Sequence, residues 1–250
     1  MANSKQTSDE IVVKINGLNK AFGDHVVLKN FDLELKRGEN RVVLGKSGSG
    51  KSVLIKCIIG LMEPDSGAIE VLGQNIPDLG HVELDQVRVK IGFLFQSNAL
   101  YDSMTVRQNL EFPLRRHWMQ ITQKEVEEMV MEALDNVDLM HTVDMMPSEL
   151  SGGMRKRIAL ARTLILKPEI ILYDEPTTGL DPITSLEIIE LINAIREKYK
   201  TTAIIITHDL KCVRLTADLV TMLIEGCNYE TATYEALAQS NDPKIRQFFD

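Results

Sequence analysis

The sequence predicts an α/β fold, a mostly parallel β-sheet with helices on both faces, and two observations support this prediction. Short, nearly continuous apolar runs alternate with helical patterns along the chain. Such runs are typical of strands that are buried on both faces. The runs are residues 41–44, 91–95, 170–173, 203–207 and 219–224. Between residues 97 and 167 the strand-like character disappears, which indicates an inserted helical region.

The first buried run is followed by a strand, loop and helix pattern. After residues 41–44 comes a glycine-rich loop, and beyond it the apolar residues Val53, Leu54, Cys57, Ile58 and Leu61 recur at helical spacing. Gly60 and Pro64 predict the end of this helix. We therefore expect a helix that begins near Lys51 and has Cys57 in the protein core.

Residues 122–140 predict the main helix of the insertion, because acidic residues alternate there with Val, Met and Leu at helical intervals. The charges are most simply explained as a solvated helix face. Met129, Met131, Met140, Met145 and Met146 favour a flexible core, although an adaptable groove for a partner helix stays open. We expect one domain over residues 1–250, with a core formed by 1–96 and 168–250 and a helical subdomain formed by 97–167.

Composition excludes several classes of function. The 250 residues have a formal net charge of -8, and Lys and Arg are dispersed, so a nucleic-acid partner is not expected. The three cysteines show no metal-ligand spacing and suit reduced thiols in the cytosol. No apolar run approaches the roughly 18 to 20 residues that a membrane-spanning helix needs, and the N-terminal residues are polar. Any role at a membrane is therefore expected to pass through another subunit.

Residues 45–52 form a complete phosphate-binding loop between the first buried strand and the helix that follows it. The loop reads Gly45-Lys46-Ser47-Gly48-Ser49-Gly50-Lys51-Ser52. Glycines let backbone N–H groups close around a phosphate, and the helix N-terminus adds positive potential. We expect Lys51 to reach the β- and γ-phosphates of a nucleotide and the hydroxyl of Ser52 to bind Mg²⁺.

Two adjacent carboxylates, Asp174 and Glu175, come directly after the apolar run 170–173. The carboxyl end of a strand in a parallel sheet is where ligands bind in such folds. Asp174 is expected to hold Mg²⁺, and Glu175 to polarise the attacking water. An apolar run that ends in Asp-Glu is weak evidence alone, but together with the phosphate loop it predicts a nucleoside triphosphatase.

Leu150-Ser151-Gly152-Gly153-Met154 predicts a second phosphate-binding element. Ser151 and the two glycines can present backbone donors at the N-terminus of a helix over residues 155–166. The simpler interpretation is an ordinary helix N-cap followed by a flexible loop.

This segment resembles the LSGGQ signature of the ABC transporter family, with Met154 in place of the usual Gln, and the resemblance extends over essentially the whole chain. It implies a RecA-like P-loop NTPase core with an antiparallel, β-rich N-terminal part and a helical subdomain. It also implies that Phe22 stacks on adenine, that Gln96 senses Mg²⁺ and the attacking water, and that His208 contacts the γ-phosphate. Asp181 lies in the segment that links two sites across a dimer. In this family Ser151, Gly152 and Gly153 meet the γ-phosphate held by the opposite subunit.

Within this family, three segments and the C-terminus are similar to the ATPases of MCE-type (Mla) phospholipid transporters. The segments are 95–106, 147–154 and 174–185, and the terminal stretch is 242–249. The resemblance implies a homodimer that binds ATP and Mg²⁺, sits peripherally on the cytoplasmic side of the bacterial inner membrane, and assembles with permease subunits and a lipid-binding MCE-type partner. Leu180, where some relatives carry Gln, is a second departure from the family pattern. ATPases of amino-acid importers, of lipoprotein release or of iron–sulfur assembly remain alternatives.

Overall fold

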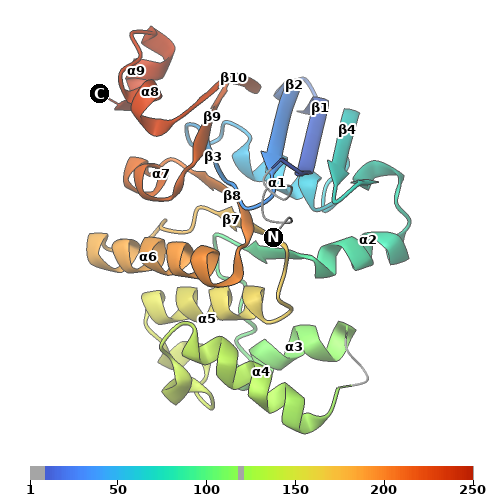
Figure 1. Ribbon diagram of the computed structural model, residues 1–250, viewed down its shortest axis with the longest axis vertical. Helices are drawn as coiled ribbons and strands as arrows, with labels where there is room; N and C mark the ends of the chain where they lie inside the picture. Colours follow the sequence, from blue (N-terminus) through green and yellow to red (C-terminus); the bar gives the residue numbers. More distant parts are fainter. Residues whose placement is uncertain (1–8, 118–120, 250) are drawn as a thin grey trace, which may run out of the picture. The chain divides into compact units, whose positions relative to one another are not determined.

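The computed structural model describes residues 9–117 and 121–249, so most of the polar N-terminal segment lies outside the described residues (Figure 1). The chain divides into two compact units. The first holds the chain up to Arg88 and from Thr201 onward, and the second holds Val89–Lys200. The helical subdomain expected over 97–167 falls inside the second unit. That unit also contains the strands and the helix on either side of the expected subdomain.

An antiparallel sheet occupies the N-terminal part of the first unit. It contains β1 (Ile11–Phe22), β2 (His25–Lys36), β4 (Ser66–Val71) and β5 (Gln74–Asn75), in the order β2-β1-β4-β5. Along β2 the side chains of Phe31, Leu33 and Leu35 are buried and the residues between them are exposed. This period of two is expected for a sheet with one face on the core. The β-rich N-terminal part is therefore present as the family resemblance implied.

The second sheet of the first unit is built around β3 (Asn40–Leu44). This strand lies between β8 (Thr202–Thr207) and β9 (Leu219–Ile224) and is parallel to both, whereas β10 (Cys227–Ala232) pairs antiparallel with β9. All five residues of β3 are buried, as expected for a strand covered on both faces. The two polar ones are hydrogen-bonded, since Asn40 donates to the carbonyl oxygen of Thr216 and Arg41 to the carboxylate of Glu39. The helices of this unit are α1 (Lys51–Ile58), α2 (His81–Val89), α7 (Leu210–Thr216), α8 (Tyr234–Ala238) and α9 (Pro243–Phe249), with a 3-10 turn at Ile76–Asp78. Cys57 is fully buried in α1, as predicted.

The second unit joins two parallel strands to a group of helices. The strands are β6 (Ile91–Leu94) and β7 (Ile170–Asp174), and the helices are α3 (Val106–His117), α4 (Gln123–Asp135), α5 (Gly152–Leu164) and α6 (Pro182–Tyr199). 3-10 turns lie at Met140–Thr142 and Pro147–Glu149. Helices α3, α4 and α5 lie next to one another (Figure 1), and their buried side chains form one apolar core. Met129, Met131 and Met145 pack against this core, which favours their role as core filler, and Met140 is exposed.

Two helices of this unit have boundaries that differ from the predicted ones. The pattern over 122–140 indicates helical structure throughout, but α4 ends at Asp135 and the chain turns at Asp138, whose φ of 57° is left-handed. Its start is fixed by a capping box between Thr122 and Glu125. Helix α5 begins at Gly152 and not at residue 155, since the side chain of Ser151 accepts a hydrogen bond from the backbone N–H of Met154.

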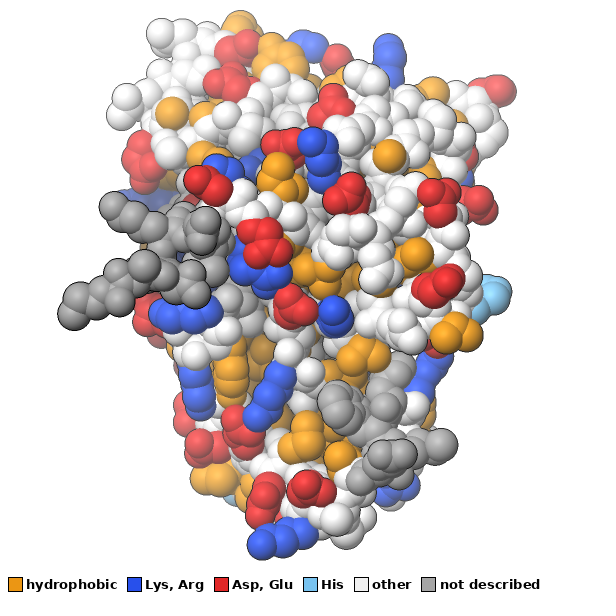
Figure 2. Space-filling view, turned by 45° about the vertical axis from the view of Figure 1, so that its right-hand side comes forward, with side chains coloured by type: hydrophobic (Ala, Val, Ile, Leu, Met, Phe, Trp, Pro, Cys, Tyr) orange, Lys and Arg blue, Asp and Glu red, His pale blue; other side chains and the backbone are white. Residues whose placement is uncertain are grey.

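The architecture confirms the predicted α/β class with a mostly parallel sheet. On the face shown in Figure 2, Lys and Arg side chains are interspersed with Asp and Glu. Within residues 9–117 and 121–249, none of the helices combines the length and the apolar character that crossing a membrane requires.

Candidate functional site

The phosphate loop connects the end of β3 to the start of α1 in the first unit. Gly48 and Gly50 have φ values of 78° and 102°, which favour glycine. A Cβ on Gly45 would lie 2.6 Å from the Oγ of Ser49 and 2.9 Å from the carbonyl oxygen of Leu223. Side chains at these positions would therefore block the loop conformation. The tight turn leaves backbone donors at the N-terminus of α1, which carries no acidic residue in its first turn.

Lys51 and Ser49 show that the loop fits an anion. Lys51 is 5% exposed, and its Nζ donates to the carbonyl oxygens of Gly45 at 2.8 Å and Lys46 at 3.1 Å. These bonds hold the ammonium group against the loop. The Oγ of Ser49 is buried and has no hydrogen-bond partner in the part of the chain that the structure describes. A buried hydroxyl without a partner is unfavourable, and a phosphate oxygen would satisfy it.

The carboxylate pair lies at the C-terminal end of β7 in the second unit. Asp174 is 6% exposed and Glu175 is 7% exposed. The hydroxyl of Thr178 donates to an oxygen of Glu175 at 3.2 Å and so orients this carboxylate. Glu175 has a φ of 48°, a left-handed conformation that costs a non-glycine residue about 1 to 3 kcal/mol. Such strain persists where the surrounding structure imposes it, and it is common at functional sites.

Lys156 interacts with both the carboxylate pair and the segment of Gln96, and it was not predicted from the sequence. It is 2% exposed in α5, and its Nζ donates to the backbone carbonyl of Gln96 at 3.1 Å. Burial lowers the pKa of the Lys156 ammonium to about 8, and the charges of Asp174 and Glu175 oppose this effect. The sequence did carry a signal, because Lys156 precedes the buried Leu160 by four residues and so lies on the buried face of the helix.

The glycine-rich segment before α5 and the segment before α6 both form helix N-termini. Ser151 and Gly152 are exposed, and Gly153 packs so closely that an added Cβ would lie 2.6 Å from the Cγ2 of Thr184. Asp181 caps α6 by accepting hydrogen bonds from the backbone N–H groups of Ile183 and Thr184. The hydrogen bond from the Thr184 hydroxyl, together with these backbone bonds, lowers the pKa of Asp181. Ser151 is thus a helix N-cap, but Gly152 and Gly153 form the first turn of α5 and not a flexible loop. The role of this N-terminus in binding phosphate stays a prediction.

The remaining predicted site residues are distributed over both units. Phe22 ends β1 in the first unit, where it is 49% exposed and the Nζ of Lys20 lies 5.6 Å from its ring centroid. His208 follows β8 in the same unit and is exposed. Gln96 follows β6 in the second unit and is also exposed. Within the first unit the phosphate loop follows β3 and His208 follows β8, and these two strands are paired in parallel. Within the second unit it links Gln96 to the carboxylate pair through Lys156.

A phosphate loop between a strand and a helix, with a carboxylate pair at the end of another strand, defines a P-loop nucleoside triphosphatase. The model of the family described as ABC transporter matches residues 28–178, and the chain belongs to this family. It is an ATP-binding and ATP-hydrolysing subunit of the ABC type, as the sequence predicts.

The similar proteins include transport ATPases and a solved cassette dimer. The chain is 39% identical over 240 residues to a probable ribonucleotide transport ATP-binding protein of Mycobacterium leprae, covering 96% of this chain and 69% of the relative. It is 37% identical over 239 residues to the intermembrane phospholipid transport system ATP-binding protein of Escherichia coli K12, covering 96% of this chain and 88% of the relative. A dimeric ATP-binding cassette in a post-hydrolysis state, bound to ADP and phosphate, superposes with a TM-score of 0.81 at 32% identity, covering 89% of this chain and 98% of that one.

Proposed function

We propose that this chain powers the movement of phospholipid between membranes, as the ATPase homodimer of a transporter with permease subunits and a lipid-binding MCE-type partner. The similarity to the Escherichia coli phospholipid transport protein, over 96% of this chain, carries the proposal. A protein of the same name from Haemophilus influenzae is 37% identical over 237 residues. The proposal places the chain peripherally on the cytoplasmic side of the bacterial inner membrane.

In the proposed site, residues 45–52 bind the phosphates of ATP and Lys51 faces the β- and γ-phosphates. The buried, unpaired hydroxyl of Ser49 supports this assignment. Ser52, Asp174 and Gln96 would hold Mg²⁺, because this ion prefers oxygen ligands. Its charge would neutralise part of the negative charge of the phosphates. Phe22 stacks on the adenine, as its exposed ring allows.

The hydrolytic step is assigned to Glu175, which accepts a proton from the attacking water while the hydroxyl of Thr178 fixes its carboxylate. His208 donates a hydrogen bond to the γ-phosphate. The backbone donors of Gly152 and Gly153, with Ser151 and Asp181, come from the opposite subunit and complete the site. ATP must bind the closed dimer about 10⁴-fold better than the open one to move the population from 1:99 to 99:1. A γ-phosphate that is bound by both subunits can supply this difference, and hydrolysis removes it.

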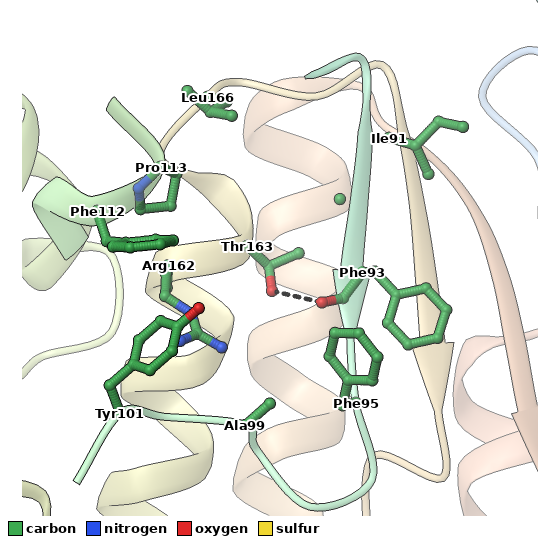
Figure 3. A pocket seen from close by; sticks show the side chains of 11 residues that line it. Ile91, Phe93, Phe95, Ala99, Tyr101, Phe112, Pro113, Arg162, Thr163 and Leu166 are labelled. Atoms are coloured by element: carbon green, nitrogen blue, oxygen red, sulfur yellow. Dashed lines mark hydrogen bonds between the residues drawn. The ribbon is translucent and has the colours of Figure 1, made fainter. Parts of the chain in front are cut away.

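An aromatic cavity of about 470 Å³ in the second unit is proposed as the docking site of a permease helix (Figure 3). The rings of Tyr101 and Phe112 have centroids 4.8 Å apart and are 43% and 36% exposed as residues. The guanidinium of Arg162 lies 5.8 Å from the Tyr101 ring and donates to the carbonyl oxygen of Asn98. Burial lowers the pKa of Arg162, and among the described residues no carboxylate pairs with it. The cavity therefore suits a helix with apolar side chains and an acidic group or free carbonyls.

Replacing Tyr101 by glutamate is expected to abolish stimulation of ATP hydrolysis by the permease, because a desolvated carboxylate in an apolar cavity costs several kcal/mol. Binding of ATP should stay native, since the phosphate loop belongs to the other unit. Tyr101 is a cleaner test than Leu100, which packs against the core of the second unit. Val82→Glu, at a residue in α2 that is 73% exposed, is the control. Native stimulation of the Tyr101→Glu variant would refute docking at this cavity.

Purifying the chain in complex with the membrane subunits encoded beside its gene tests the cargo. The expected result is bound phospholipid and ATP hydrolysis that phospholipid stimulates. The relatives named for ribonucleotide transport make ribonucleotides the alternative cargo. Stimulation by ribonucleotides with no effect of phospholipid would contradict the lipid assignment, and so would an obligate periplasmic amino-acid receptor.

A further inference from the structure

Lys156 occupies an unusual position, as an ammonium group with almost no contact with solvent. The residue is 2% exposed, and it is among the largest fully buried side chains of the described chain. Its Nζ donates to the carbonyl oxygen of Gln96 at 3.1 Å, with a longer contact of 3.5 Å to that of Phe95. The charges of Asp174 and Glu175 also act on this ammonium group, and they raise its pKa against the effect of burial.

A buried ammonium group is unfavourable unless hydrogen bonds and opposite charges compensate for the lost water. Here the carbonyl oxygens supply the hydrogen bonds and the carboxylates supply the charge. The dependence is mutual, because two adjacent carboxylates that are both more than nine-tenths buried repel each other unless a cation lies nearby. In the segment after β6, the carbonyl oxygen of Gln96 accepts from Lys156, and that of Phe95, which also accepts from the backbone N–H of Asn98, lies within 3.5 Å of the same ammonium group. Lys156 therefore fixes the segment that carries Gln96 relative to the end of β7.

We infer that Lys156 is a positioning residue for ATP hydrolysis, which holds Gln96 and the carboxylate of Glu175 in the arrangement that the attacking water requires. The inference rests on the proposed roles of these two residues. It has a further consequence, since Lys156 belongs to the same helix as Ser151 and Gly153. A shift of α5 when this N-terminus engages the partner's nucleotide would move Lys156 and, with it, the Gln96 segment.

Replacing Lys156 by methionine tests the inference, because methionine has a similar length but no charge and no donor. The kcat for ATP should fall about 10- to 100-fold, the size of effect that a displacement of about 1 Å can have. The equilibrium Kd for ATP should stay within about twofold of native, because the phosphate loop lies in the other unit. Lys167→Met, at an exposed lysine just beyond α5, is the matched control and should leave both quantities unchanged.

A double-mutant cycle with Gln96→Ala separates positioning from a general loss of structure. If Lys156 acts through Gln96, its replacement should have a clearly smaller effect on kcat in the Gln96→Ala background than in the native one. If Lys156→Met loses its cooperative melting transition, Lys156→Gln replaces it in the same double-mutant cycle. Equal factors in both backgrounds, an unchanged kcat of Lys156→Met, or loss of cooperative melting by both variants would overturn the inference.

The outcome for Glu175→Gln distinguishes this inference from the proposed function. If Glu175→Gln abolishes turnover while Lys156→Met does not affect it, the proposed hydrolytic site stands and the positioning role is wrong. If Glu175→Gln hydrolyses ATP at the native rate, the proposed site itself is wrong.

Discussion

Replacing Glu175 by glutamine is expected to lower ATP turnover by about 10²- to 10⁴-fold, the usual contribution of a positioned general base. The substitution removes the charge that we propose polarises the attacking water, but it keeps the size of the side chain. The left-handed backbone at this position accepts either residue with similar strain. ATP binding should therefore survive, and ATP should accumulate in a closed dimer that cannot reopen by hydrolysis.

Single-turnover kinetics and light scattering with ATP measure the two parts of this prediction separately. Glu169→Gln, which changes a glutamate immediately before β7, controls for the loss of a negative charge near this strand and should hydrolyse ATP normally. A Glu175→Gln variant with native turnover would remove this residue from the chemistry. A variant that loses turnover but stays monomeric with ATP would leave Glu175 catalytic and contradict the trapped dimer.

The buried strands and the two halves of the site could be predicted from sequence because local chemistry fixes them. Residues 170–173 are apolar throughout, as a strand covered on both faces requires, and β7 adds only Asp174 to them. The phosphate loop was recognisable because its glycines are needed for left-handed turns and close packing. Membership of the ABC transporter family followed from the order of such motifs along the chain, and the family match confirms it.

Features that depend on tertiary packing could not be predicted from the sequence. Strand β1 has an irregular register around Gly17, so its alternation of apolar and polar residues is interrupted and only the family resemblance indicated it. The left-handed backbone of Glu175 has no sequence signal, because glutamate does not favour that conformation. Burial of Lys156 depends on the carbonyl oxygen of Gln96 and on the charges of Asp174 and Glu175, all of which are distant from it in sequence.

Lys51→Ala is expected to weaken ATP binding about 10- to 100-fold, because it removes a charge-assisted hydrogen bond to the phosphates. It also removes the bonds from Nζ to the carbonyl oxygens of Gly45 and Lys46, which brace the loop. Ser151→Arg should abolish turnover by a different route. It fills the surface that we propose meets the partner's nucleotide, and loss of the N-cap costs only about 1 kcal/mol of stability. At an ATP concentration near the native Kd, each variant alone is therefore expected to be folded but to show little or no turnover.

Mixing these two inactive variants tests directly whether ATP is hydrolysed at sites shared by two chains. In a mixed dimer, one site carries both substitutions and the other carries neither. With random pairing half of the dimers are mixed, so turnover should recover to at most about one quarter of native. Recovery on mixing is the predicted result. Turnover no higher than that of the separate variants, in a sample where mixed dimers are shown to form, would contradict the shared site.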